Sequence, residues 1–376
     1  MNSILIFLCL AYIFKIFYES YTLNKYRKQI KLIIHVNGIR GKSTVCRLID
    51  AGLRNGKLRI FTKVTGTSPR YISTNGNEYP IKRIGKANIR EQIKFLKKAA
   101  EEKSDIAIFE CMAVNPILQK ICEQKILKSD ISIITNVRED HLDLMGNTLD
   151  KIALSLSNTI NKNGLFFTSD KQYFDFFQKI CKTNNTKAFL SLNSYEETFD
   201  FPENINLALN VCNTLGINCQ EALIRMKEYK KDSGVLKTIL YTNNYNSKIY
   251  FVNALAVNDP DSTTNIINIF KNTHLWNKKR YLLVNNRRDR LFRMIQFKDF
   301  LKNNSNDFQE LLISGENKNL FYREVKSFYK NIQLIENLDF LENFQEDSII
   351  FAVGNICGEG NKIIKHIENR GVLYER

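Results

Sequence analysis

The segment that most constrains this 376-residue chain lies near its start, where an apolar run leads into a glycine-rich loop and then a helical pattern. Residues 31–36 read KLIIHV, which is typical of a buried strand, and residues 44–55 after NGIRGKST have helical periodicity. Backbone N–H groups of such a loop can surround phosphate oxygens, and the N-terminus of the following helix adds partial positive charge. The order strand, glycine loop, helix predicts the start of an α/β nucleotide-binding domain.

The loop itself holds the first candidate binding residues. A phosphate loop places its lysine, here Lys42, on the β- and γ-phosphates and its hydroxyl, here Ser43, on Mg²⁺. Val36 stands where the strict P-loop pattern has its first glycine, so the alternative is a plain helix-capping turn. The predicted ATP contacts in this segment are Asn37, Gly38, Arg40, Gly41, Lys42, Ser43 and Thr44.

Two further candidate sites follow predicted strands. Glu110 ends the strand predicted at residues 106–109, and Asp140 and His141 follow the one predicted at residues 131–135. Parallel sheets bind ligands at the carboxyl ends of their strands, and carboxylates there suit Mg²⁺. Each alone could instead be a strand-end acid or a capping Asp beside a surface His. We predict catalytic roles for Lys42, Glu110 and His141, and metal binding by Ser43, Glu110 and His141.

Strand and helix patterns alternate along most of the chain. Helices are predicted at residues 88–102, 119–128 and 149–159, and strands at 106–109, 131–135 and 165–168. This order predicts a mostly parallel sheet with helices on both faces. Helical patterns at residues 204–229 lead to a polar, glycine-ended stretch at 230–234. Beyond it, strands predicted at 249–254, 281–285, 310–313 and 348–353 indicate a second, smaller α/β domain.

The N-terminus reads as a membrane anchor. Residues 4–14 carry no charge, Lys15 interrupts, and an apolar stretch continues to Tyr18. This is short of about 20 residues for a straight span, but Lys15 can snorkel, and neither a basic leader nor a cleavage site suggests a signal peptide. An interfacial amphipathic helix is the alternative. The basic residues at 25, 27, 28 and 31 predict that the downstream chain is cytoplasmic. The predicted domains are therefore 1–22, 23–234 and 235–376.

Net charge and cysteine usage exclude fewer classes of protein than the motifs do. A net charge of +16 suits nucleic acid, an anionic membrane surface or a polyanionic substrate, but also simple compositional bias, because the lysines are spread out. A nucleic-acid-binding ATPase would show clustered arginines interleaved with stacking aromatics, and the aromatics here fall mostly in apolar runs. The eight cysteines form no CxxC pair and read as reduced thiols. We expect no nucleic-acid partner.

The three candidate sites together resemble the Mur ligase superfamily, whose loop G-T-x-G-K-[ST] also lacks the first P-loop glycine. Its strand-end Glu and its N-x-x-x-D-H-L-D segment are similar to Glu110 and to residues 136–143, in order and spacing. Residues 256–262 (AVNDPDS) resemble a further segment of that superfamily. The resemblance implies a P-loop-containing Mur-ligase-like central domain with a parallel sheet flanked by helices, and a smaller C-terminal Rossmann-like α/β domain.

Within the superfamily, the chain looks like the ligase subunits of poly-γ-glutamate (capsule) synthases. The runs that carry this resemblance are VNGIRGKSTV, TGTSPR, PIKR, ECMAV, NVREDHLDLMG, NDPDST, NNRRDR and VGNICG, at residues 36–45, 65–70, 80–83, 110–114, 136–146, 258–263, 285–290 and 353–358. It implies further ATP contacts at Asn258, Asp259 and Arg287, and a substrate channel lined by Thr67, Ser68 and Arg70; the latter three could instead form an ordinary surface loop.

The resemblance implies an ATP-dependent amide ligase that polymerises glutamate through an acyl phosphate, with ATP and Mg²⁺ as cofactors. Its partners would be glutamate, the growing polymer and integral-membrane synthase subunits at the cell membrane, and a homo-oligomer is compatible with it. The alternatives are a γ-glutamyl ligase like folylpolyglutamate synthase and a non-catalytic, nucleotide-binding scaffold of an export complex. Two departures stand out: residues 152–159 (IALSLSNT) lack the superfamily's carbamylated lysine, and Lys237 stands where an arginine is usual.

Overall fold

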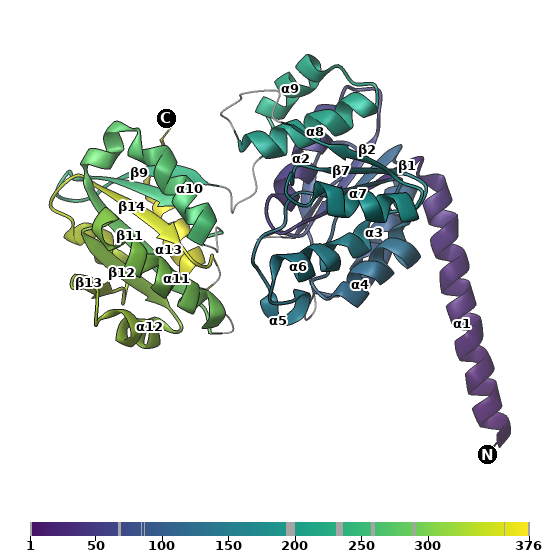
Figure 1. Ribbon diagram of the computed structural model, residues 1–376, viewed down its shortest axis with the longest axis horizontal. Coiled ribbons are helices and arrows are strands. Elements are labelled where there is room, and N and C mark those ends of the chain that lie inside the picture. Colours follow the sequence, from purple (N-terminus) through teal and green to yellow (C-terminus); the bar gives the residue numbers. More distant parts are fainter. Residues whose placement is uncertain are drawn as a thin grey trace. The chain divides into compact units, whose positions relative to one another are not determined.

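The computed structural model describes residues 2–66, 69–83, 85, 87–192, 200–230, 236–256, 260–288, 291–356 and 358–374. The chain divides into two compact units, Met1–Asp232 and Ser233–Arg376 (Figure 1). Each unit has its own sheet and its own apolar core, and each is described separately below.

The first unit is built on an eight-stranded sheet with the order β4-β3-β2-β5-β1-β6-β7-β8. Strands β2, β5, β1, β6, β7 and β8 are parallel neighbours, and the β3–β4 hairpin adds antiparallel strands at one edge. The parallel sheet expected from the alternating pattern is confirmed. The strands are β1 (Leu32–Asn37), β2 (Ile60–Val64), β3 (Arg70–Ile72), β4 (Glu78–Pro80), β5 (Ile106–Glu110), β6 (Ile131–Ile134), β7 (Leu165–Thr168) and β8 (Lys187–Leu190).

Helices cover both faces of this sheet. Because side chains alternate along a strand, Ile34 of β1 packs with α2, α8 and α9, whereas Ile33 packs with α3 and η1 on the other face. The helices α6 and α7 cover β6 and β7. The helices are α2 (Lys42–Leu53), α3 (Arg90–Glu101), α4 (Pro116–Ile121), the π-helix η1 (Cys122–Leu127), α5 (Leu142–Met145), α6 (Leu149–Leu156), the 3-10 turn η2 (Ser157–Thr159), α7 (Phe174–Thr183), α8 (Pro202–Thr214) and α9 (Cys219–Lys227).

One predicted helix differs in its bounds. The helix expected at residues 119–128 starts earlier, at Pro116, because the Asn115 side chain accepts hydrogen bonds from Ile117 N and Leu118 N and proline suits the first helical position. It then continues as the π-helix η1. The sequence contains this helix-start signal, Asn-Pro, but the apolar helical pattern begins only a few residues later.

The second unit is also an α/β layer structure. Its sheet has the order β13-β12-β11-β14-β10-β9-β15, parallel except for β9 and β15. The described helices α10, α11 and α12 pack on one face and α13 on the other. The antiparallel strand β9 precedes the first strand expected here. The bounds are β9 (Lys237–Thr242), β10 (Lys248–Asn253), α10 (Pro260–Lys271), β11 (Lys279–Asn286), α11 (Leu291–Asn303), β12 (Glu310–Gly315), α12 (Lys318–Val325), β13 (Ile332–Leu334), β14 (Ser348–Val353), α13 (Glu359–Arg370) and β15 (Val372–Leu373).

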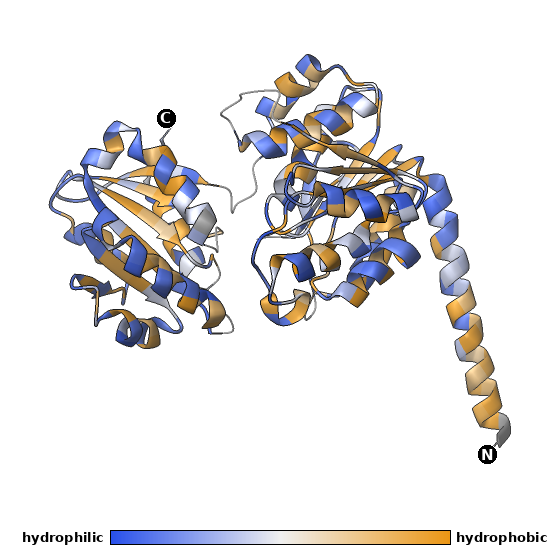
Figure 2. Cartoon of the chain, in the orientation of Figure 1, coloured by the Kyte–Doolittle hydropathy of each residue, from blue (hydrophilic) through white to orange (hydrophobic). Residues whose placement is uncertain are grey.

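The N-terminal helix α1 (Asn2–Gln29) is longer than the predicted anchor and runs almost directly into β1. Within the described part of the chain, it is the one helix long and apolar enough to cross a membrane. Figure 2 colours the first half of this helix mostly as hydrophobic and the half next to β1 mostly as hydrophilic. The large apolar side chains from Ile4 to Tyr18 are 49–71% exposed, so no described part of the chain covers them.

Candidate active site

The loop between β1 and α2 depends on two glycines. Gly38 has φ +126°, and a Cβ there would lie 2.1 Å from Thr135 Oγ1 at the end of β6. Gly41 caps α2 with φ +78°, and its Cβ would lie 2.5 Å from Asn204 Oδ1 on α8. Only glycine allows both the left-handed backbone and these close approaches. The loop is therefore held tightly against β6 and α8.

Hydrogen bonds fasten the loop to the residues after β6. The backbone N–H of Arg40 donates to Asn136 Oδ1 (3.0 Å), and the carbonyl oxygen of Arg40 accepts from Thr135 Oγ1 (2.6 Å) and Asn136 Nδ2 (3.2 Å). Ile39 N donates to Asn136 O (3.2 Å). Asn136 is the first residue of the NVREDHLD segment, so the two predicted motifs form one connected structure.

Lys42 is folded back over the loop. Its ammonium group donates to Gly38 O (2.8 Å) and Ile39 O (3.1 Å). These carbonyls fix a positive charge beside the N-terminus of α2, whose first backbone N–H groups have no partner within the helix. This combination of a lysine, a tight loop and a helix N-terminus is suited to a phosphate group.

Ser43 and Glu110 meet at the carboxyl end of the sheet. Ser43 Oγ donates to Glu110 Oε2 (2.8 Å), which also accepts from the backbone N–H of Thr65 (2.6 Å). Glu110 is only 2% exposed, and β5 lies beside β1 in parallel register. A hydroxyl and a carboxylate oxygen at this separation are ligands that Mg²⁺ accepts in combination with phosphate oxygens and water. The residues present therefore fit the expected metal.

A buried cation, Lys63, lies near Glu110, and the sequence pattern did not identify it as a site residue. Lys63 on β2 is fully buried and pairs with Glu91 (2.9 Å), which Arg83 also contacts through two hydrogen bonds of 2.7 and 2.9 Å. Burial lowers the pKa of Lys63, partly opposed by Glu91 and Glu110. Burial alone would raise the pKa of Glu91, but Arg83 and Lys63 hold it at about 2.

His141 lies after β6 in a strained backbone position. It has φ +50°, its N–H donates to Asp140 Oδ1 (2.9 Å), and its ring lies 3.8 Å from Asp140 Oδ2. Asp140 also pairs with Arg40 of the loop (3.5 Å), which links His141 to the phosphate loop. No group of three or more His, Cys, Asp or Glu side chains among the described residues is placed to hold a metal by itself. A metal role for His141 thus remains a prediction.

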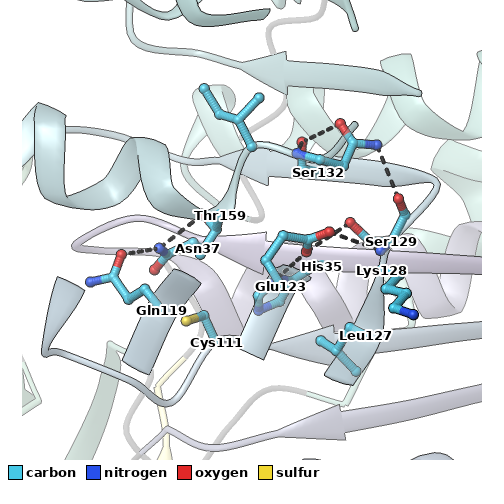
Figure 3. Close-up of polar contacts among 12 residues, drawn as sticks. His35, Asn37, Cys111, Gln119, Glu123, Leu127, Lys128, Ser129, Ser132 and Thr159 are labelled. Atoms are coloured by element: carbon cyan, nitrogen blue, oxygen red, sulfur yellow. Dashed lines mark hydrogen bonds and ion pairs between the residues drawn. The ribbon is translucent and has the colours of Figure 1, made fainter. Parts of the chain in front are cut away.

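Asn37 has a different environment from the rest of the loop. Its side chain is 3% exposed and donates to Gln119 Oε1 (3.1 Å) and Thr159 Oγ1 (3.1 Å) beneath the sheet (Figure 3). Because Asn37 still belongs to β1, its side chain points to the α4 face and supports the loop from below. The side chain is thus bonded within the protein, and the predicted ATP contact of Asn37 stays a prediction, now for its backbone.

The remaining predicted residues fall into two groups. Arg70 on β3 lies 3.8 Å from the buried Glu78, and Arg287 follows β11 in the second unit. Thr67, Ser68, Asn258 and Asp259 lie outside the described residues. The segment that lacks the carbamylated lysine forms α6 and η2, with Ile152, Leu156 and Thr159 buried.

Solved structures share this architecture. Folylpolyglutamate synthase from Thermotoga maritima has a TM-score of 0.65 at 13% identity, covering 98% of both chains. E. coli FolC in complex with ADP has a TM-score of 0.72 at 12% identity, covering 93% of this chain and 92% of its own. MurF from Acinetobacter baumannii has a TM-score of 0.64 at 12% identity, covering 93% of this chain and 79% of its own. At these identities the likeness establishes the fold.

Sequence comparisons establish the class and the family. The Mur ligase middle domain matches residues 36–227, and the poly-gamma-glutamate synthase CapB C-terminal domain matches residues 239–370. The fold and the loop are thus those of Mur-type ligases, ATP-dependent enzymes that form amide bonds. PGA synthase CapB of Bacillus subtilis (strain 168) is 34% identical, covering 89% of each protein. The chain belongs to the poly-γ-glutamate synthase CapB family. Capsule biosynthesis protein CapB of Bacillus anthracis is 36% identical over 76% of this chain, and the match spans 64% of that relative's length.

Exchanging Glu110 for glutamine is expected to raise the Mg²⁺ concentration needed for half-maximal ATP turnover by roughly tenfold, because an amide oxygen carries no net charge for a hard cation. Titration of Mg²⁺ at saturating ATP measures this shift. Glu102→Gln is the matched control, because Glu102 is a hydrogen-bonded acid of the same unit that contacts Ser73 and Thr74. An unchanged midpoint in Glu110→Gln would remove this acid from the metal site.

Proposed function

We propose that this chain is the ligase of a poly-γ-glutamate synthase, which uses ATP to join glutamate units through their γ-carboxyl groups. The observation that carries the proposal is the meeting of Ser43 and Glu110 beside Lys42 at a phosphate loop, in a chain 34% identical to a PGA synthase over most of its length. A non-catalytic scaffold would not need the hydroxyl, the carboxylate and the ammonium to converge.

The first step is transfer of a phosphoryl group to a carboxylate. A terminal carboxylate oxygen of the polymer attacks the γ-phosphorus of ATP, the bond to the bridging oxygen breaks, and ADP leaves. Two anions repel one another, so the site must offset charge on the transferring group. Lys42 would bind the β- and γ-phosphates, and the N–H groups of the loop and of α2 would hold the others. Arg40, Gly41 and Thr44 belong to this cradle.

The second step forms the amide. The amine of the next glutamate attacks the acyl carbon, phosphate leaves with the C–O electron pair, and the amine loses a proton. His141, held by Asp140 next to Arg40, is the residue we assign to the acyl-phosphate side of the site. Arg70 would attract the polyanionic chain, and Arg287 of the second unit would contact the nucleotide, together with Asn258 and Asp259.

Mg²⁺ is the ion we assign to Ser43 and Glu110, where it would offset phosphate charge. Two related folds were solved with nucleotide and metal: the Yersinia pestis folylpolyglutamate synthase/dihydrofolate synthase with AMPPNP and a Mn ion, and a bifunctional enzyme of the same name with Mn, AMPPNP and L-glutamate. These show what those proteins bind and support nucleotide, divalent cation and glutamate as the ligands here.

The apolar half of α1 supports a location at the cell membrane, with both α/β units in the cytoplasm and integral-membrane synthase subunits as partners. Ligation at the membrane would place the product where a polymer can be exported. The basic excess of the chain would also attract a growing polyanion.

The proposal is tested by incubating membranes that contain the chain, with and without co-expressed partners, with ATP, Mg²⁺ and labelled glutamate. We expect γ-linked polymer with one ADP and one phosphate per bond formed. Label that enters polymer in a Lys57→Ala control but disappears in Lys42→Ala would assign the synthesis to this site. ATP consumption without any γ-linked product would refute the ligase assignment, and extension only of an added pteroyl-glutamate would favour the folylpolyglutamate alternative.

A further inference from the structure

The second half of α1 is docked on the first unit and is not a free tether. Glu19 pairs with Arg90 at the start of α3 (2.7 Å), and the ring of Tyr26 lies under Lys97 of the same helix (5.9 Å to the ring centroid). Arg27 donates to Leu127 O (3.0 Å) and pairs with Asp130 (2.6 Å). The exit direction of the apolar half is therefore set by the fold.

These contacts define the edge of the sheet past which α1 leaves. Gln92, in the first turn of α3, donates to Glu110 O (2.9 Å), which places the start of α3 at the carboxyl end of β5. Asp130 precedes β6, so Arg27 lies at the opposite, amino edge. The helix α1 thus runs along α3 from the carboxyl edge at Glu19 to the amino edge, and residues 2–18 extend past the carboxyl edge.

Exposed apolar side chains lie at that same edge. Ile117 (68% exposed) and Leu118 (40%) start α4, which follows β5, and Leu144 (50%) lies on α5, which follows β6. We call these three residues the edge patch. The helices α4 and α5 both contact α6, on the same face of the sheet as α1 and α3. Two exposed cations, Arg90 and Lys94, belong to α3, which packs along α1, and Arg90 pairs with Glu19 of that helix.

The length of α1 sets the distance to a bilayer. Residues 2–18 of a helix span about 25 Å at 1.5 Å per residue, close to the roughly 30 Å hydrocarbon thickness. The membrane surface would then lie within one or two helical turns of Glu19, at the level of Arg90 and the edge patch. Exposed leucine and isoleucine beside cations are the side chains that enter a lipid interface.

We propose that the edge patch rests in the headgroup region of the bilayer that α1 crosses, so that the carboxyl edge with Ser43 and Glu110 faces the membrane. This inference rests on α1 being an anchor and is independent of the ligase chemistry. The acids Glu139 and Asp143 also lie after β6, so the contact depends on apolar insertion more than on charge. The product would be formed next to the membrane that it has to cross.

The test uses the full chain in vesicles of phosphatidylcholine, with and without phosphatidylglycerol. An environment-sensitive fluorophore is introduced at Ile117 or Leu144 as a noncanonical side chain, and the lipids carry a headgroup-level spin-label quencher. The matched control position is Ile224, which is 66% exposed on α9, a helix that packs with α2 on the opposite face of the sheet. We expect loss of most of the emission at positions 117 and 144, at low and high salt, and little loss at 224.

Equal quenching at positions 117 and 224 would overturn the proposal, as would an unquenched probe at 117 in vesicles where the chain floats with lipid. A probe at 117 that is shielded only in native membranes would assign the patch to a protein partner instead. A second variant distinguishes insertion of the patch from mere proximity to the membrane. It carries Ile117→Glu and Leu144→Glu, with the probe moved to Lys120. We expect this variant to lose the quenching but to retain ATP hydrolysis in detergent.

Discussion

Replacing Lys42 with alanine is expected to lower ATP turnover by about a hundredfold or more, because the site would lose the positive charge that offsets the transferring phosphoryl group. The side chain bonds only loop carbonyls, Gly38 O and Ile39 O, within the part of the chain that is described, so its removal leaves the apolar core intact. Measurement of ADP release with glutamate present, alongside circular dichroism of the purified variant, checks both statements.

Lys57→Ala is the matched control. Lys57 is an exposed lysine shortly after α2, in the same unit and away from the loop. Its loss should leave turnover unchanged. Lys42→Arg adds a finer test: the charge is kept, but a planar guanidinium cannot place a compact charge over the same two carbonyls, so we expect partial activity. Wild-type polymer output from Lys42→Ala would show that the phosphate loop is not the centre of the reaction.

The sequence predicted the elements that carry the site because their signals are local. Strand, glycine loop and helix around Lys42 lie within one short segment, and Glu110 closes an apolar run. Their convergence follows from parallel pairing, since β1 and β5 place their carboxyl ends at one edge. The order of these motifs along the chain carried the family resemblance, and the domain matches across both units confirm that resemblance.

Partners from distant segments could not be predicted in this way. Asn204 on α8 approaches Gly41, and the backbone N–H of Thr65 binds Glu110, yet neither residue has a local pattern that announces the contact. Lys63 looks like a solvated lysine in sequence, whereas the fold buries it fully with Glu91. These contacts depend on which strand lies beside which, and a single sequence does not specify that order.

The position of Asn37 at the end of β1 decides where its side chain points. Along β1, Ile34 and Val36 point to the α2 face, whereas Ile33, His35 and Asn37 point to the other. The loop turns away only at Gly38, so Asn37 is still bound by the alternation of the strand. A motif match alone treats it as part of the loop, but the strand places its side chain among Gln119 and Thr159.

His35, two residues before Asn37, belongs to a second polar cluster on this face (Figure 3). Its Nδ1 lies 2.8 Å from Glu123 Oε2 of η1, and both side chains are at most 3% exposed. Ser129 donates to the same carboxylate through its N–H and its hydroxyl, at 2.9 Å each. Burial alone would lower the pKa of His35, but contacts with Cys111, Cys122 and Glu123 raise it well above its usual value.

Glu123→Ala is expected to destabilise the first unit by about 3 kcal/mol, because it leaves a buried imidazolium without its counter-charge. Amide hydrogen exchange of β1 and η1, corrected for intrinsic rates, measures the local free energy of opening. The matched control is Glu101→Ala, which breaks an exposed i,i+4 pair with Lys97 at 3.6 Å and should cost less than about 1 kcal/mol.

The pH dependence of this destabilisation distinguishes the loss of the charge pair from the loss of side-chain volume. Because the folded pKa of His35 is raised, its contribution is fully present below the unfolded value of about 6.5 and is lost as pH rises through the folded pKa. The difference between wild type and Glu123→Ala should therefore be largest below pH 6.5 and shrink at higher pH. A cavity effect would not depend on pH, so a constant difference would show that the pair is held as neutral groups. In either case the effect is measured at β1, the strand that leads into the phosphate loop, because β1 carries His35.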